Sequence, residues 1–137
     1  MFKRFSRTLG AAPTTSGQLG YNNIVVNGTT SSIAANITAS IYDISVPSGT
    51  WYIGAGYRVN NLNVTTTTQL SIGISFVANY LTSNSPLTVF GGVGNTFGNS
   101  STIVSGSSAS TWYLVVQNNN SQSFNFDSIY VALTRIA

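Results

Sequence analysis

The chain has 137 residues, of which 42% are hydrophobic and 12% aromatic, while only 5% carry a charge. Globular proteins normally have about a quarter of charged residues, so this surface must consist of Ser, Thr, Asn, Gln and Gly. Intrinsic disorder is excluded, because disordered chains combine low hydrophobicity with high charge. The chain has no cysteine, which excludes disulfides and thiolate metal sites. Its length is that of a single domain with its own core.

The net charge of +3 arises at the start of the chain. The first twenty residues contain three cations and no acid: Lys3, Arg4 and Arg7. From Tyr21 onward, two arginines balance two aspartates. The sequence therefore predicts a basic arm and linker over residues 1–20 and a neutral folded domain over residues 21–137. A nucleic-acid-binding face is disfavoured, since it needs Lys and Arg clustered on the folded surface.

Along the domain, alternation of apolar and small polar residues predicts β-strands separated by polar turns. Strands are expected at residues 23–26, 40–46, 51–59, 69–80, 102–104, 110–117 and 124–136. The pattern is clearest over residues 69–80, where six side chains are expected to point inward: Leu70, Ile72, Ile74, Phe76, Ala78 and Tyr80. Trp51 and Trp112 are expected in the core. The glycine-rich stretch 91–101 is expected to be a flexible loop, because no lysine or helix follows it to make a phosphate cradle.

These elements define the fold class. No segment has the 3.6-residue period of an amphipathic helix, and the helix formers Glu and Lys are nearly absent. Seven or eight strands joined by long polar turns predict an all-β fold, an antiparallel β-sandwich. No apolar run approaches the roughly 18 residues that a membrane span needs, so no membrane span is expected.

The last expected strand, in FNFDSIYVALTRIA, is apolar on both faces. Ile129, Val131 and Leu133 point one way, whereas Tyr130 and Ala132 point the other. Such a strand needs cover on both sides, either from its own chain or from another subunit. If another subunit supplies the cover, Val131→Asp should give soluble monomers; if the chain covers itself, the variant should misfold.

Residues suited to catalysis are scarce. The only acids are Asp43 and Asp127, each inside a strand pattern, and there is no histidine. A nucleophilic serine needs a neighbouring base, and an acid pair needs both acids at a cleft. Calcium needs closely spaced acidic ligands. The sequence therefore predicts no enzymatic activity, no catalytic or metal-binding residues and no cofactor.

Two stretches carry a resemblance to a known family. SIYDISVPSGTWYIGAGYRVN (40–60) and STWYLVVQNNNSQSFNFDSIYVALTRIA (110–137) resemble the complement-globular-head and tumour-necrosis-factor-like jelly roll. There, an apolar-Pro-Gly-aromatic pattern begins a core strand; here Pro47 and Gly49 would form the turn and Trp51 the anchor. The ending YVALTRIA is similar to the ends of phage tail-fibre and virion-surface versions. The missing cysteine fits a viral source better than a secreted animal one.

The resemblance implies a jelly roll that forms a homotrimer, with the last strand near the threefold axis. On that reading the interface residues are Ile129, Tyr130, Val131, Leu133 and Arg135. A neutral exterior suits dense arrays of identical copies, because they do not repel one another. The resemblance thus implies a protein of the virion surface, in capsid or tail.

Three functions stay open. The favoured one is a virion structural protein of the decoration, minor-capsid or short-fibre type, docked to an acidic groove of a capsid or tail protein. Its anchor would be the arm, whose cations alternate with aromatic rings: Phe2, Lys3, Arg4, Phe5 and Arg7. The second is a fibre tip that binds host glycan or receptor through loops 60–68, 83–100 and 118–123. The third is a cellular trimeric adhesion module. Only about twenty residues precede the domain, which favours direct docking on a virion over a shafted fibre.

Overall fold

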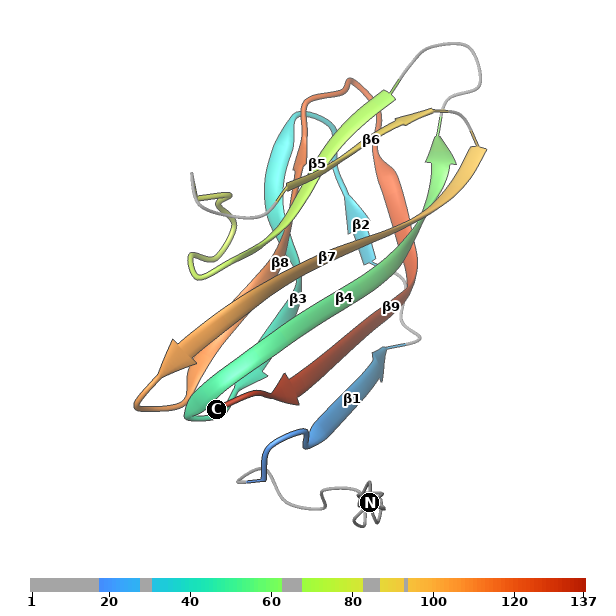
Figure 1. The fold of residues 1–137 in the computed structure, drawn as a ribbon. Helices are drawn as coiled ribbons and strands as arrows, with labels where there is room; N and C mark the ends of the chain where they lie inside the picture. Colours follow the sequence, from blue (N-terminus) through green and yellow to red (C-terminus); the bar gives the residue numbers. More distant parts are fainter. Residues whose placement is uncertain (1–17, 28–30, 63–67, 83–86, 93) are drawn as a thin grey trace, which may run out of the picture.

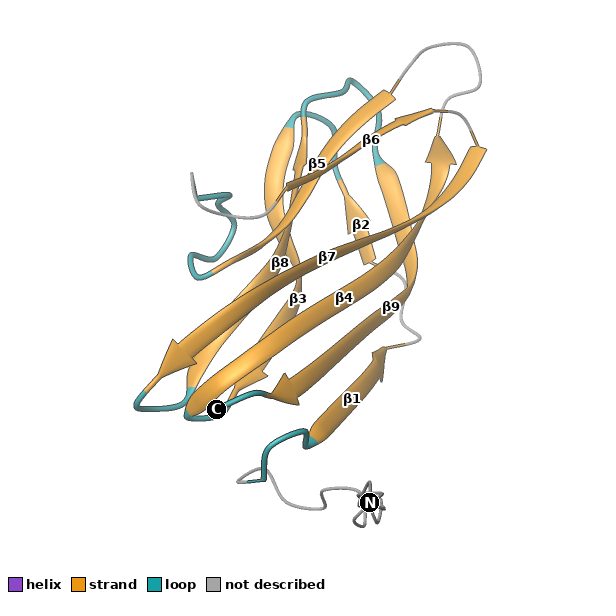
Figure 2. Ribbon diagram, viewed as in Figure 1, coloured by secondary structure: helices purple, strands orange, loops and turns teal. Residues whose placement is uncertain are grey.

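The computed structural model of the chain describes residues 18–27, 31–62, 68–82, 87–92 and 94–137. These residues form nine β-strands, and Figure 2 shows no helix among them. The strands are β1 (Asn22–Asn27), β2 (Ser31–Ile33), β3 (Ile37–Val46), β4 (Gly49–Leu62), β5 (Thr68–Ser75), β6 (Leu87–Gly92), β7 (Gly94–Gly106), β8 (Ser110–Asn118) and β9 (Phe124–Arg135). The described part of the chain has no helix long and apolar enough to span a membrane. The predicted all-β fold is confirmed.

The strands form two antiparallel sheets. Sheet A has the order β1-β9-β4-β7, with β2 also paired to β9, and sheet B has the order β3-β8-β5-β6. The pairs are nested: β2 with β9, β3 with β8, β4 with β7, and β5 with β6. The chain therefore behaves as one long hairpin that has been rolled up, so that successive pairs fall on alternate sheets (Figure 1). A five-stranded and a four-stranded sheet built in this way form a jelly roll.

The core lies between the two sheets and follows the predicted alternation. Five alternate residues of β4 are buried: Trp51, Ile53, Ala55, Tyr57 and Val59. From sheet B, Leu70, Ile72 and Ile74 of β5 belong to the same core. Burying a large apolar side chain contributes about 1.5–3 kcal/mol, so this single cluster holds the two sheets together.

The strand expected over residues 69–80 ends early, at Ser75. The Ser75 hydroxyl accepts a hydrogen bond from the Val77 backbone N–H (3.1 Å), and the chain then turns at Asn79, whose φ is +56°. Phe76 and Tyr80, expected to be core residues, are 59% and 60% exposed. The alternation past Ser75 was therefore a misleading signal, because the backbone leaves the sheet.

Residues 76–82, here called the cover segment, cross the outer face of sheet B. The Asn79 side-chain oxygen accepts from the Ser40 backbone N–H (2.8 Å), and the Asn79 N–H donates to the Ser40 hydroxyl (2.8 Å). Ser40 lies on β3, and β8 lies between β3 and β5, so a segment joined to both passes over β8. Val115 of β8 alternates with core residues and so faces outward, yet it is fully buried. The buried Val115 and the two hydrogen bonds between Asn79 and Ser40 together indicate that the cover segment lies over this face.

The glycine-rich stretch 91–101, expected to be a loop, is mostly strand. It contains the end of β6 and the first part of β7, and β7 pairs with β4 from Gly94 to Gly106. Backbone pairing with a long neighbouring strand does not need β-branched side chains, which is why local sequence missed it. The short strand β2 was missed in the same way.

The predicted Pro47–Gly49 turn is confirmed, and it forms part of a cluster at one end of the core. Gly49 has φ +116°, and a Cβ there would lie 2.8 Å from the Arg135 guanidinium. Arg135 lies over the Trp51 ring at 5.7 Å and donates to the Ser48 carbonyl oxygen (3.1 Å). The C-terminal Ala137 is hydrogen-bonded to Thr50, and Figure 1 shows the C-terminus beside the start of β4.

A buried asparagine organises the β8–β9 turn. The Asn118 amide nitrogen donates to the carbonyl oxygens of Ala34 (2.8 Å) and Gln122 (2.8 Å). The Asn118 side-chain oxygen accepts from the Asn120 backbone N–H (2.9 Å). This residue was expected at the edge of an exposed binding loop, but it is fully buried. It holds the turn rather than facing a ligand.

Asn118→Ala should lower the free energy of unfolding by about 1–3 kcal/mol, since it removes the buried amide that donates hydrogen bonds to the Ala34 and Gln122 carbonyl oxygens. Urea denaturation followed by circular dichroism measures the change. Asn119→Ala is the matched control, because Asn119 is exposed, and its midpoint should equal that of the wild type. Equal midpoints for both variants would contradict the structural role of Asn118.

Candidate functional site

The structure divides the predicted interface residues of β9 between the core and the surface. Ile129, Val131 and Leu133 are buried in the core of the single chain. Their burial accounts for one apolar face of β9 without a second subunit. Arg135 packs on Trp51 of its own chain, and Tyr130 is 39% exposed on the outer face of sheet A. The anchoring arm, including Phe2 and Phe5, lies outside the described residues.

The outer face of sheet A brings together three strands in register. One row across β7, β4 and β9 is Ile103, Tyr52 and Thr134; the next is Ser101, Gly54 and Ala132; the third is Asn99, Gly56 and Tyr130. Tyr52 is 42% exposed and Ile103 62% exposed. Two glycines thus lie in the middle of a sheet face that carries three large exposed side chains.

These glycines form the floor of a shallow pocket of about 280 Å³, here called the Gly54–Gly56 groove. Its lining residues are Tyr52, Gly54, Ala55, Gly56, Asn99, Ser100, Ser101 and Tyr130. Ala55 and Ser100 are buried residues whose neighbours in the strand face outward. The groove is therefore a strip of bare backbone between two tyrosines.

Neither glycine is required by the fold of the single chain. Gly54 and Gly56 do not belong to the described glycines with positive φ. A Cβ added to Gly54 would lie 3.5 Å from its nearest atom, a ring carbon of Tyr52. A Cβ added to Gly56 would lie 3.9 Å from its nearest atom, the Gly98 carbonyl oxygen. Both are ordinary contacts. Glycine inside a strand destabilises it by about 0.5–1 kcal/mol relative to alanine and often marks a close approach by a ligand or another backbone.

An ion pair borders the groove on the next row, where Arg58 pairs with Asp127. The Arg58 Nε donates to one carboxylate oxygen of Asp127 (2.6 Å), and the Asn60 amide donates to the other (2.7 Å). Hydrogen bonds from Arg58 and then Asn60 lower the pKa of Asp127 to about 2. A break in register between Gly56 and Arg58, with Ser128 at φ 52°, positions the pair. The two charges cancel, so this face stays neutral.

The pKa of Asp127 predicts how stability changes in acid. An unfolded aspartate titrates near pH 3.9, above the folded value of about 2, so the ionised group stabilises the fold above about pH 4. That contribution is lost as the pH falls from about 4 to 2. Thermal melts of the wild type and Asp127→Asn should differ above pH 4 and converge towards pH 2. A difference that stays constant down to pH 2 would contradict this assignment.

The two acids do not form a chemical site together. Asp43 is exposed on β3 of sheet B, whereas Asp127 is held by Arg58 and Asn60 on sheet A. Within the described ranges, no three residues of the His, Cys, Asp and Glu types gather as metal ligands. The predicted lack of catalysis and of a metal stays a prediction.

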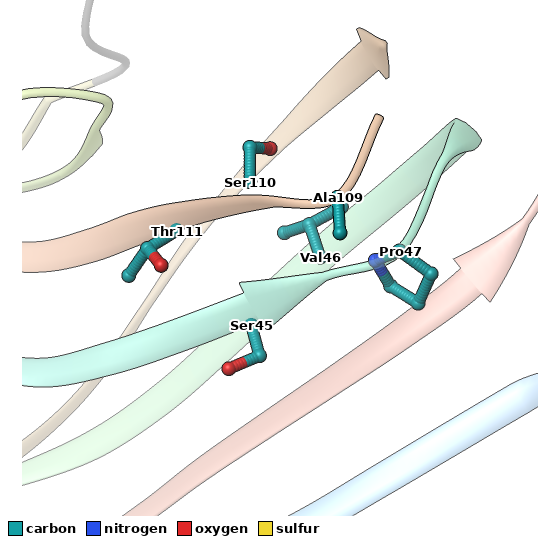
Figure 3. Close-up of a pocket in the computed structure, with 6 residues that line it drawn as sticks. All are labelled: Ser45, Val46, Pro47, Ala109, Ser110 and Thr111. Atoms are coloured by element: carbon teal, nitrogen blue, oxygen red, sulfur yellow. The ribbon is translucent and has the colours of Figure 1, made fainter. Parts of the chain in front are cut away.

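A second hollow, of about 440 Å³, lies where β3 ends and β8 begins. Its lining residues are Ser45, Val46, Pro47, Ala109, Ser110 and Thr111. Figure 3 shows Pro47 beside Val46 and Ala109, while Ser45 and Ser110 point to opposite sides. No ionisable side chain lines this hollow, so it can offer only hydroxyl and backbone hydrogen bonds.

The groove was not identified from the sequence. The alternation of Tyr52, Gly54 and Gly56 was visible, and outward glycines in a strand are the signal that could have marked it. Ser101 and Tyr130 join the groove only through the pairing of β7 and β9 with β4. Of the loops expected to bind glycan or receptor, segments 63–67 and 83–86 lie outside the described residues.

The sequence matches no protein-family profile and no curated protein. In structure, the chain is similar to three solved structures of infectious bursal disease virus. For the Gx strain the TM-score is 0.61 at 8% identity, over 86% of this chain and 33% of that chain. For a T13 viral particle the TM-score is 0.60 at 8% identity, over 87% of this chain and 32% of the viral chain. For a VP2 subviral particle it is 0.55 at 10% identity, over 85% and 33%. This chain spans about a third of each viral chain, and at these identities the likeness is one of fold.

Proposed function

We propose that the chain is a structural protein of a virus particle, with a trimeric jelly roll displayed on the capsid or tail surface and a basic arm as its anchor. The observation that carries the proposal is the fold: the jelly roll aligns over 86% of this chain with a protein of the infectious bursal disease virus particle. The neutral body supports it, because identical copies can pack side by side without charge repulsion.

The arm supplies the anchor in this proposal. Lys3, Arg4 and Arg7 alternate with Phe2 and Phe5, so the peptide can pair its charges with acids and place its rings in apolar pockets. The body offers it only Asp43 and Asp127 as acidic partners, and Asp127 is held by Arg58. An acidic groove on a capsid or tail protein is the partner that fits this chemistry.

Deletion of residues 1–10 should leave a folded trimer that no longer enters virus particles. Mass spectrometry of purified particles measures incorporation, and light scattering measures the assembly state. Binding of the full chain should depend only moderately on salt, because the phenylalanines contribute; a steep salt dependence would indicate nucleic acid as the partner. Normal incorporation of the truncated chain would refute the anchor, and absence of the full chain from particles would refute the virion role.

A further inference from the structure

We propose that the outer face of sheet A, centred on the Gly54–Gly56 groove, is the surface through which copies of this chain associate. The inference rests on the proposed trimer and names its contact surface. This surface differs from the predicted β9 set, since Ile129, Val131 and Leu133 are buried in their own core. Its exposed members are Tyr52, Ile103 and Tyr130.

The two sheets differ in how their outer faces are covered. On sheet B the cover segment is joined to Ser40, and Val115 of β8 is fully buried. The large exposed apolar side chains on this side belong to the cover segment itself or to the start of β3: Phe76, Val77, Tyr80 and Ile37. On sheet A, large side chains remain exposed in the middle of the face, with Ile103 at 62% and Tyr52 at 42%. Tyrosine is enriched at protein interfaces and among the residues that contribute most to binding.

The two glycines indicate close contact by an outside partner. Neither φ nor internal packing requires glycine at position 54 or 56. A partner backbone or side chain can therefore reach the floor of the groove. A small ligand seated in the groove would leave Ile103 uncovered, because Ile103 lies on the next row beside Tyr52. A second protein surface covers the groove and Ile103 together.

Charge favours a second copy as that partner. In an assembly of identical chains, like groups meet across symmetry axes, so an unbalanced charge on this face would repel its mates. The charged residues placed on this face are Arg58 and Asp127, which neutralise each other within the chain. The face is thus neutral as well as apolar, and it can meet another copy without electrostatic cost.

Gly54→Thr separates association from folding. The added Cβ makes only an ordinary contact, with Tyr52 at 3.5 Å, in the single chain, and threonine suits a strand, but its side chain fills the groove. We expect the full-length variant to sediment as a monomer where the wild type sediments as a trimer, with a melting temperature no lower than that of a wild-type sample diluted to monomers. Ser45→Thr, at an exposed position of sheet B, is the matched control and should stay trimeric. A trimeric Gly54→Thr variant would overturn the proposal.

A single thiol gives a second measurement, because the chain has no cysteine of its own. Ser101 lines the groove and is exposed in the single chain. In Ser101→Cys, the rate of maleimide labelling should fall in proportion to the assembled fraction and recover on dilution. Ser45→Cys should label at one rate throughout. If the Ser101→Cys chain sediments as a trimer and its thiol still labels at the monomer rate, the proposed contact surface is wrong, but the proposed trimer is not contradicted. A wild-type chain that is monomeric at every concentration would refute both.

Discussion

Val131→Asp should prevent the chain from folding. The wild-type side chain is buried between the sheets, and no described cation lies in the surrounding core cluster. An unpaired charge buried in this way costs several kcal/mol, which is comparable to the total stability of a domain, about 5–15 kcal/mol. Circular dichroism and denaturation of the purified variant should show no cooperative unfolding transition, and most of the protein should be insoluble.

The matched control is Tyr130→Asp, one position earlier in β9. Tyr130 faces the outer side of sheet A and is 39% exposed, so an aspartate there stays hydrated. This variant should fold with a cooperative transition and, if the sheet A surface joins the copies, sediment as a monomer. From sequence alone, a soluble monomer would be expected for Val131→Asp if another subunit covered β9. The structure transfers that expectation to Tyr130→Asp. A folded, soluble Val131→Asp protein would contradict the placement of β9.

Trp51→Ala should lower the free energy of unfolding by about 3–5 kcal/mol, the range for large-to-small changes of an aromatic core residue. Trp51 is fully buried. The centroid of its ring lies 6.3 Å from the centroid of the Tyr21 ring, which meets it edge-on, and 5.7 Å from the guanidinium carbon of Arg135. The variant therefore leaves a cavity and also removes the surface on which Arg135 rests. Urea denaturation monitored by circular dichroism gives the value directly.

Trp112→Ala is the control with the same change of side chain. Trp112 was expected in the core, but it is only half-buried and packs against the core, with the exposed Phe76 ring at 5.9 Å. Because less of its surface is removed from water, its loss should cost clearly less than that of Trp51. Equal losses for the two variants would mean that the end of the sandwich near Trp112 is as tightly packed as the turn at Trp51.

Local sequence was sufficient to predict those features that depend on a single strand or a single turn. The burial of Trp51, Ile53 and Ala55 follows from the two-residue period of a strand, and it needs no knowledge of the neighbouring strands. The turn before them follows from Pro47, which restricts φ, and from Gly49, which adopts +116°. The neutrality of the body likewise follows from composition alone.

Only the tertiary structure decided which strands become neighbours, and the candidate site depends on that. Tyr130 meets Gly56, and Asp127 meets Arg58 at a sequence separation of 69 residues; no local pattern encodes such a pairing. The end of β5 depends in the same way on the bond between Asn79 and Ser40, 39 residues apart. In β9, alternation showed two apolar faces but not which would be buried. The sequence determined the alternation within β4, the turn before it and the charge balance, because these are local properties. The packing of the rolled hairpin decided the rest, because one face of β9 meets sheet B and the other is left to solvent or to another copy.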